Sequence, residues 1–475
     1  MAYLAIDLGA GSGRAIVGNI RDNRIELDEV HRFSNRQIRL GDTLYWDFPA
    51  LFAEIKQGIF KAVQKGYSIQ SIAVDTWGVD FGLLDKQGRL LSNPVCYRDA
   101  RTQGILQEAF KKISKEKLYE STGNQLMEIN TVFQLFSLVQ SDNPQLAIAD
   151  KLLFTPDLVN YFLTGFIGNE YTIASTSQLL NAKSRTWEPA IFEALHIPQQ
   201  LMSPIVFPGT VIGKLRPEIA AETGAEDVNV IAVGSHDTAS AVAAIPASAD
   251  ENWAFLSSGT WSLLGIELDK AITTPEAMEN NFTNEGGVGN KIRFLTNITG
   301  LWLLQCLMSE WEKEAGNPVS YEYLLEKCTQ ATDFQSIVNP DDAAFVNPSS
   351  MSKAIVDYCI RTQQTAPKTK GEFTRCVLQS LALKYASAIE SLKKCTHQTI
   401  TKLYIVGGGS KNELLNQYTA DAAGVEVVTG ISESTVLGNV IQQAISGGQI
   451  SGIEEGRKIV RNSFKLTSYQ PQNTA

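Results

Sequence analysis

Residues 5–14 combine residue types that could bind a phosphate group. Asp7 ends a short apolar run, and the residues after it include Gly9, Gly11, Gly13 and Arg14. Glycine lets the backbone approach a ligand closely, and successive backbone N–H groups in such a turn form an anion-binding nest. A guanidinium suits phosphate, and a carboxylate beside phosphates can hold Mg²⁺ directly or through water. Taken alone, the segment fits a ligand-free hairpin turn equally well, and no Walker loop occurs in the chain.

The second half of the chain contains two further turns of this kind. Residues 254–265 (AFLSSGTWSLLG) run from an apolar strand through a small, polar turn into another strand, and residues 403–412 (LYIVGGGSKN) end a β-rich run. Two related halves that each open with a strand, a turn and a strand predict a duplicated domain enclosing one nucleotide. Coincidence is the alternative in a chain with 36 glycines, and the ordered spacing argues against it.

A candidate general base lies in residues 230–241 (VIAVGSHDTASA), where a buried strand runs into a helix start. His236, Asp237 and Thr238 occupy the turn. An aspartate there could accept the proton of a substrate hydroxyl as its oxygen attacks a γ-phosphoryl group. Spacing alone favours another interpretation, in which Asp237 or Thr238 caps a helix over residues 239–244. A cap does not explain His236 in a chain with only four histidines.

Two other polar clusters could contact a sugar. Trp77 and Gly78 offer an apolar wall beside an accessible backbone. The charged residues that follow are Asp80, Arg98, Asp99 and Arg101. We expect most of these four to form a structural ion-pair network rather than to bind hydroxyls. Asn297 precedes an amphipathic helix expected over residues 300–313, and Gln305 lies just over two turns further along.

Hydrophobic periodicity predicts the elements that position these residues. In the first half we expect strands at 4–8, 14–19, 24–32 and 69–76, and helices at 48–65, 131–140 and 155–163. In the second half we expect strands at 402–406 and 425–429, and helices at 300–313, 375–393, 412–423 and 435–445. This order is typical of a mixed sheet with helices packed on it. Small and polar residues at 246–251 indicate a domain junction.

Bulk properties exclude several classes of protein. A length of 475 residues favours two or three domains. The formal charge of −10 argues against nucleic acid or an anionic membrane as partner. No leader peptide and no membrane-spanning apolar run is recognisable, so we expect a cytoplasmic protein. The six cysteines show no metal-binding spacing, and a disulfide between Cys359 and Cys376 stays open.

The motifs, taken in order, resemble the FGGY family of carbohydrate kinases over essentially the whole chain. They are DLGAGSGR, DTWGVDF, YRDARTQG, GSHDTASA, LSSGTWSL, TNEGG, NITGLWLLQ and IVGGGSKN. The resemblance implies an α/β fold of two ribonuclease-H-like domains, of the actin and hexokinase ATPase type, with the active site in the cleft between them. Residues 1–246 would carry the sugar site, the first phosphate turn and the catalytic aspartate. Residues 247–475 would carry the second phosphate turn and the adenosine site.

DTWGVDF, SHDTASA and TNEGG are the more specific motifs, and they point to the branch of the family that phosphorylates L-rhamnulose in L-rhamnose catabolism. The implied substrates are L-rhamnulose and ATP with Mg²⁺, and the products are L-rhamnulose 1-phosphate and ADP. The resemblance makes Asp237 the catalytic proton acceptor and Asp7 the residue that positions the metal. The positions that match the family's sugar site are Gly78, His236, Asp237, Thr238 and Asn297. Those that match its ATP site are Ala10, Gly11, Ser12, Gly13, Arg14, Thr260, Gln305 and Gly408.

Two alternatives stay open at this point. The first is a kinase for another ketose or polyol, such as L-fuculose, D-xylulose or glycerol, because sequence alone does not rank epimers. The second is a non-catalytic nucleotide-binding module of the actin or Hsp70 type, which would need a partner surface that the motifs do not supply. The sequence does not determine the oligomeric state, and we favour a monomer.

Overall fold

The computed structural model describes residues 2–472, and the chain folds into two compact units. Unit 1 comprises Met1–Ser248, Glu267–Phe294 and Glu433–Phe464. Unit 2 comprises Ala249–Ile266, Leu295–Ser432 and Lys465–Ala475. Each unit is built from three separate stretches of the sequence, whereas the sequence predicts a single domain boundary after residue 246. That boundary concerns the two domains implied by the family resemblance, and it stays a prediction.

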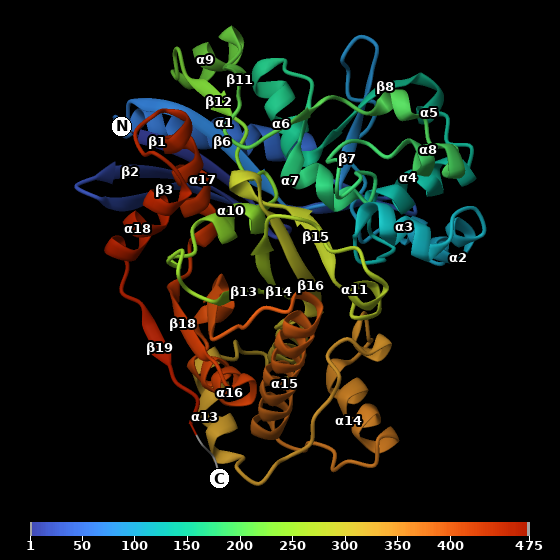
Figure 1. The fold of residues 1–475 in the computed structure, drawn as a ribbon, viewed down its shortest axis with the longest axis vertical. Helices are drawn as coiled ribbons and strands as arrows, with labels where there is room; N and C mark the ends of the chain where they lie inside the picture. Colours follow the sequence, from blue (N-terminus) through green and yellow to red (C-terminus); the bar gives the residue numbers. More distant parts are fainter. Residues whose placement is uncertain (1, 473–475) are drawn as a thin grey trace. The chain divides into compact units, whose positions relative to one another are not determined.

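Unit 1 is built on a six-stranded sheet with the order β11-β12-β6-β1-β2-β3 (Figure 1). Its strands are β1 (Ala2–Leu8), β2 (Ser12–Arg21), β3 (Arg24–Ser34), β6 (Ile69–Thr76), β11 (Val211–Lys214) and β12 (Asn229–Ile231). Strand β1 pairs antiparallel with β2 and parallel with β6, and β2 pairs antiparallel with β3. The expected three-strand meander and the strand at 69–76 are confirmed.

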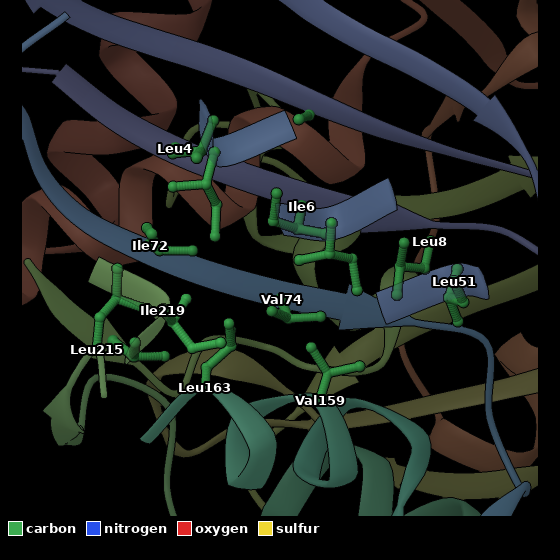
Figure 2. Packing of buried hydrophobic residues seen from close by; sticks show 14 of the residues in the cluster. Leu4, Ile6, Leu8, Leu51, Ile72, Val74, Val159, Leu163, Leu215 and Ile219 are labelled. Carbon is green, nitrogen blue, oxygen red and sulfur yellow. The ribbon is translucent and has the colours of Figure 1, made fainter. Parts of the chain in front are cut away.

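One face of this sheet carries a large apolar core (Figure 2). Leu4, Ile6 and Leu8 alternate along β1 onto this face because side chains alternate across a strand. Three helices cover it: α1 (Phe48–Gln64), α6 (Thr155–Thr164) and α9 (Pro217–Thr223). The predicted helices at 48–65 and 155–163 are therefore confirmed within two residues at their ends.

The other face of the sheet is covered by α10 (Asp237–Ala243) and α17 (Ser434–Ser446). In Figure 1, α17 is drawn in red beside the blue strand β1, although the two are far apart in the sequence. A Cβ on Gly438 of α17 would collide with the backbone of Ser240, so only glycine allows the two helices to pack this closely. The same packing brings Asn439 of α17 to the end of β6, beside the functional residues described below.

Unit 2 contains the central strands of a seven-stranded sheet with the order β15-β16-β14-β13-β17-β18-β19. The strands of this sheet are β13 (Trp253–Ser258), β14 (Trp261–Leu268), β15 (Thr283–Gly286), β16 (Ile292–Thr299), β17 (Lys402–Val406), β18 (Glu426–Ile431) and β19 (Thr467–Tyr469), of which residues 267–294 belong to unit 1. Strand β13 pairs antiparallel with β14 and parallel with β17, just as β1 pairs with β2 and β6. Strands β18 and β19 repeat the β12–β11 pairing. The predicted duplication is confirmed by this strand order.

Helix starts were the least predictable boundaries. Helix α12 (Trp302–Ala315) begins two residues after the expected position, because Gly300 belongs to a turn whose backbone N–H donates to the carbonyl of Thr260. Helix α15 (Lys370–Thr396) begins five residues before the expected position, because Thr369 and Glu372 form a capping box. Helices α4 (Thr131–Gln140) and α16 (Glu413–Ala423) match closely.

The remaining elements lie around these two sheets. The helices are α2 (Ile105–Phe110), α3 (Lys115–Thr122), α5 (Gln145–Ile148), α7 (Tyr171–Ala174), α8 (Pro189–Leu195), α11 (Pro275–Glu279), α13 (Tyr321–Gln330), α14 (Met351–Arg361) and α18 (Ile453–Ser463). The short strands are β4 (Gln37–Leu40), β5 (Thr43–Trp46), β7 (Phe81–Asp85), β8 (Ala149–Phe154), β9 (Asn169–Glu170) and β10 (Ile205–Val206). Among the helices of residues 2–472, none is both long and apolar enough to span a bilayer.

All six cysteines are free thiols. Cys359 of α14 and Cys376 of α15 are both buried, and their side chains are hydrogen-bonded to each other. This hydrogen bond lowers the pKa of Cys359 and raises that of Cys376. The disulfide left open by the sequence is therefore absent from this structure, although the two residues are neighbours.

Candidate active site

The turn that carries Asp237 is fixed to the sheet of unit 1. It follows β12 and runs alongside the end of β6, where the backbone N–H of Thr76 donates to the carbonyl of Ser235 at 2.8 Å. His236 is the N-cap residue of α10, and its side chain makes no capping hydrogen bond. Asp237 is the first residue of the helix, so the capping role that spacing favoured for Asp237 and Thr238 is wrong.

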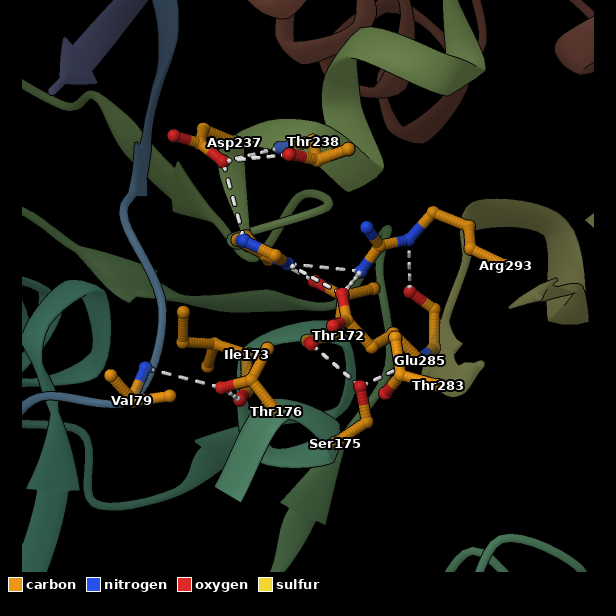
Figure 3. A network of polar contacts seen from close by, with 12 residues as sticks. Val79, Thr172, Ile173, Ser175, Thr176, Asp237, Thr238, Thr283, Glu285 and Arg293 are labelled. Carbon is orange, nitrogen blue, oxygen red and sulfur yellow. Dashed lines mark hydrogen bonds and ion pairs between the residues drawn. The ribbon is translucent and has the colours of Figure 1, made fainter. Parts of the chain in front are cut away.

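One oxygen of the Asp237 carboxylate is held by its neighbours, and the other is directed away from them (Figure 3). Oδ1 accepts hydrogen bonds from the backbone N–H of Thr238 at 2.6 Å and from its hydroxyl at 3.1 Å. The same oxygen lies 3.3 Å from Nε2 of His236. The carboxylate is therefore held in one orientation and half-buried, with Oδ2 available for a reacting group.

His236 is buried between Asp237 and two charged residues on strands β15 and β16. Its Nδ1 lies 3.0 Å from Nη2 of Arg293 and 3.2 Å from Oε2 of Glu285. Arg293 and Glu285 are themselves 3.1 Å apart, and both are buried. Burial disfavours the charged form of Arg293 and lowers its pKa. Burial is also the largest single influence at Glu285 and raises its pKa, but the contacts with Arg293 and His236 together outweigh it and lower the pKa of that carboxyl.

A loop after α6 supports this turn from the other side. The hydroxyl oxygen of Thr172 accepts from the backbone N–H of His236 at 3.1 Å, and Glu170 accepts from that of Ser235 at 3.2 Å. Glu170 also caps α7 by accepting from the N–H groups of Thr172 and Ile173. Burial raises the pKa of Glu170 to about 7. Our sequence-based site excludes this loop, although Glu170 between Asn169 and residues 171–173 was a usable signal.

Gly78 lies in a strained turn just after β6. Val79, the next residue, has a φ of 67°, in the left-handed region that a β-branched side chain rarely adopts. The turn is held there because the N–H of Val79 donates to the Thr176 hydroxyl at 3.2 Å, and its carbonyl accepts from the Thr131 hydroxyl at 2.7 Å. Backbone strain of this kind is common at ligand-binding sites. The strained turn therefore supports the prediction that Gly78 binds substrate.

Trp77 is not the exposed apolar wall that the sequence suggested. It is 6% exposed, its ring lies 4.3 Å from that of Trp46, and both indole N–H groups donate to Asp80. Burial raises the pKa of Asp80 to about 6. Within the expected ion-pair network, the Gln134 side chain links Asp80 and Arg101, because its oxygen accepts from Arg101 and its nitrogen donates to Asp80.

The first glycine turn joins β1 to β2 and is closed by a hydrogen bond from the N–H of Gly9 to the carbonyl of Ser12 at 2.8 Å. Arg14 binds two carboxylates, with one nitrogen 2.5 Å from Asp7 and another 2.5 Å from Glu433. Gly11 and Ser12 are exposed, whereas Gly13 is buried against the Phe33 ring, where a Cβ would collide.

Asp7 is paired in register with a second aspartate, Asp75 of β6. Burial is the largest cause that raises the pKa of both carboxyls, and the negative charge of Asp237 raises both further. Asn439 donates to Oδ2 of Asp75 at 2.6 Å, while Oδ1 is buried with no hydrogen-bond partner. The charge of Asp237 therefore acts on both members of the Asp7–Asp75 pair.

The predicted ATP positions of unit 2 lie at the ends of parallel strands. The turn with Thr260 follows β13, and Gly408 follows β17, so both turns are at the same edge of the sheet. Gly407 has a φ of 81°, and a Cβ on Gly409 would collide with Ser258. Gly408 is exposed with open space beside it. The Thr260 hydroxyl donates to the Gln305 side-chain oxygen at 3.0 Å.

The predicted site residues therefore fall into two sets, each described within its own unit. Unit 1 holds Asp7, Ala10, Gly11, Ser12, Gly13, Arg14, Gly78, His236, Asp237 and Thr238. Unit 2 holds Thr260, Asn297, Gln305 and Gly408, with Asn297 on β16. Sequence reasoning missed Glu170, Glu285 and Arg293, which hold the His236 turn from other elements. The TNEGG motif contains Glu285, but nothing in the sequence placed it beside His236.

Comparison with known families identifies both halves of the chain. Residues 2–244 match the N-terminal domain of the FGGY family of carbohydrate kinases, and residues 254–447 match its C-terminal domain. The chain is 44% identical over 473 residues to a rhamnulokinase of Bacteroides thetaiotaomicron, which covers 100% of this chain and 96% of that protein. It is 42% identical over 467 residues to a rhamnulokinase of Oceanobacillus iheyensis, which covers 98% and 97%.

Solved structures share the fold at lower identity. A gluconate kinase from Lactobacillus acidophilus superposes with a TM-score of 0.81 at 18% identity, covering 99% of this chain and 94% of that one. A Plasmodium falciparum glycerol kinase with ADP superposes with a TM-score of 0.79 at 15% identity, covering 99% and 94%. At this level of identity the likeness establishes the fold alone.

Proposed function

Because the chain belongs to the FGGY family of carbohydrate kinases, we propose that it transfers the γ-phosphoryl group of ATP to the 1-hydroxyl of L-rhamnulose. The observation that carries this proposal is the full-length similarity, at 44% and 42% identity, to two proteins that are rhamnulokinases. The products are L-rhamnulose 1-phosphate and ADP.

Asp237 is the general base of the proposed reaction. The sugar oxygen forms a bond to the γ-phosphorus, the bond from that phosphorus to the bridging oxygen breaks, and ADP leaves with the bonding pair. Oδ2 of Asp237 takes the hydroxyl proton as the new bond forms. This assignment is supported by the orientation of the carboxylate, whose Oδ1 is already engaged by Thr238. His236, Thr238, Gly78 and Asn297 are proposed to bind the sugar.

The glycine turns are proposed to bind ATP. Residues Ala10 to Gly13 offer backbone N–H groups, and Arg14 offers positive charge if a phosphate replaces one of its carboxylate partners. In unit 2, Thr260, Gln305 and Gly408 are also proposed to bind ATP. These residues act by positioning ATP and by neutralising charge, which is the main contribution of a protein to phosphoryl transfer.

Magnesium fits the carboxylates of unit 1. The negative charge of Asp237 raises the pKa of Asp7, and the described residues contain no group of three or more His, Cys, Asp or Glu side chains arranged to hold a metal. Mg²⁺ is commonly bound by one or two carboxylates together with substrate phosphates and water, so a full protein cage is not required. We propose that Asp7 positions the ion, which would neutralise phosphate charge when bound.

The test is ADP release with Mg-ATP and a panel of L-rhamnulose, L-fuculose, D-xylulose and glycerol. A clear preference for L-rhamnulose supports the proposal. Preference for another ketose or polyol would keep the mechanism and overturn the substrate. Folded protein with no sugar-dependent turnover would favour the non-catalytic alternative. The cytoplasmic location and the monomeric state stay predictions.

A further inference from the structure

A buried ion pair, Glu285 and Arg293, contacts the proposed sugar-binding histidine without belonging to any proposed ligand site. Arg293 lies on β16 and is fully buried, and Glu285 lies on β15 and is 6% exposed. Removing two charges from water is costly, and such a pair is often no more stabilising than apolar residues. The contact with His236 therefore suggests a role beyond stability.

The guanidinium of Arg293 is fixed by several partners at once (Figure 3). Its Nε donates to the carbonyl of Gly286 at 2.8 Å. Its Nη2 lies 3.1 Å from Oε2 of Glu285 and 3.0 Å from Nδ1 of His236. A planar guanidinium can serve these directions together because its N–H groups form a rigid fork, whereas a lysine ammonium is a single point charge.

Nδ1 of His236 faces both Nη2 of Arg293 at 3.0 Å and Oε2 of Glu285 at 3.2 Å, and these two contacts favour opposite tautomers of the ring. Arginine has no acceptor and stays protonated in proteins, so Nη2 can only donate. A ring nitrogen that accepts a hydrogen bond carries no proton, which leaves the proton of a neutral imidazole on the other nitrogen. That nitrogen, Nε2, lies 3.3 Å from Oδ1 of Asp237.

We propose that Arg293, held in place by Glu285, is a positioning residue that keeps His236 in the tautomer protonated at Nε2. The Nε2–H group then faces Oδ1 of Asp237 and adds a third donor to the two from Thr238. These donors fix the plane of the carboxylate and leave Oδ2 as the basic oxygen. The opposite tautomer would donate from Nδ1 to Glu285 and would present an unprotonated Nε2 to Asp237, where two acceptors would repel each other.

The tautomer can be observed directly in the ligand-free wild-type protein. Long-range ¹H–¹⁵N spectra of protein labelled with ¹⁵N-histidine distinguish the two neutral tautomers, and a His236→Asn variant assigns the signal among the four histidines. We expect the pattern of a ring protonated at Nε2. A ring protonated at Nδ1 would overturn the proposal, and this measurement carries no risk of misfolding.

Two arginine variants test the consequence for the reaction. Arg293→Lys is expected to give mixed tautomers and to lower kcat by at least about 10-fold, since loss of an outer partner that orients a functional histidine commonly has effects of this size. The matched control is Arg457→Lys, in another ion pair of unit 1, where Nη2 of the buried Arg457 lies 2.6 Å from Glu267 and the guanidinium donates to the carbonyls of Val242 and Ala243 at the C-terminal end of α10. The control should keep both the tautomer and kcat.

The inference rests on the proposed function only for its kinetic part. Mixed tautomers in Arg293→Lys with unchanged kcat would overturn the positioning role. An unchanged tautomer in that variant would show that Arg293 does not select the tautomer of His236, and would overturn that part of the proposal. Absence of sugar kinase activity in the wild-type protein would defeat the proposed function, while the spectra would still decide the tautomer.

Discussion

The Asp237 turn of unit 1 and the Gly408 turn of unit 2 each follow a strand of a sheet, and the two sheets share the same pairing pattern. The two turns are nevertheless held in place in different ways. At the first, side chains from distant elements, Glu170, Glu285 and Arg293, contact the turn through hydrogen bonds and ion pairs. At the second, the backbone itself forms the site, because glycine positions allow close packing on Ser258.

This difference separates two tasks within one reaction. A general base must keep one protonation state and one orientation, which requires partners that fix its charge and direction. A nucleotide phosphate can be bound by backbone N–H groups, which carry no titratable charge and need only space for the ligand. We therefore expect substitutions at the first turn to change catalysis and pH dependence, and substitutions at the second to change nucleotide affinity.

The largest effect is expected from Asp237→Asn. An amide does not accept the hydroxyl proton, so kcat should fall by about 10²–10⁴-fold, the range for loss of a general base. Sugar binding should largely survive, because His236 and Thr238 are unchanged. Steady-state ADP release and sugar titration measure the two quantities. Asp250→Asn, at an exposed position, is the matched control, and near-normal turnover of Asp237→Asn would refute the assignment.

The next effect concerns the pH dependence of stability at Glu170. Burial raises the pKa of this carboxyl from 4.5 to about 7 in the folded protein. Between these values the folded state binds more protons than the unfolded state, so the unfolding free energy falls as pH rises. The loss should be on the order of 3 kcal/mol, at about 1.4 kcal/mol for each pKa unit.

Urea unfolding between pH 4.5 and 7.5 measures this dependence for wild type and Glu170→Gln. Other buried carboxyls contribute to both proteins, so the difference between the two curves isolates Glu170 and its effect on Asp157, whose pKa is raised by burial and then by Glu170. The curve of the variant should be flatter. Glu226→Gln, at an exposed site, should follow the wild type, and parallel curves for Glu170→Gln would contradict the prediction.

The contrast between locally built glycine turns and a turn held by distant side chains also explains which features the sequence could predict. The glycine turns and their flanking strands are local patterns, so β1, β6 and β17 were expected at nearly their observed positions. The partners of the turn at Ser235 and His236 are residues 170, 172, 285 and 293, and only the tertiary fold brings them together. Trp77 shows the same limit, because an aromatic residue before a glycine fits an exposed wall as well as the buried contact with Trp46 that the structure contains.

Substitutions at two adjacent glycines of unit 2, Gly408 and Gly409, are expected to distinguish an effect on packing from an effect on ATP binding. A Cβ on Gly409 would collide with Ser258, so Gly409→Ala should lower the unfolding free energy by about 1–3 kcal/mol, as overpacking does. Gly408 has open space, so Gly408→Ala should keep its stability yet raise the KM for ATP by about tenfold where the backbone approaches the nucleotide. Thermal unfolding without ligands and ATP titrations measure both, and equal destabilisation of the two variants would contradict this division.

The smallest effect is expected at the Thr260–Gln305 hydrogen bond, which is 3.0 Å long and lies at the protein surface. Gln305→Ala should raise the KM for ATP by about 2–10-fold, the equivalent of one ordinary hydrogen bond, and leave kcat unchanged. Thr260→Val should have a similar effect, and the double variant should be little worse than either, because both changes remove the same interaction. Gln330→Ala, at an exposed position at the end of α13, is the control. A fall in kcat comparable to that of Asp237→Asn would show that this turn also orients the reacting groups, and would end the distinction between the two regions.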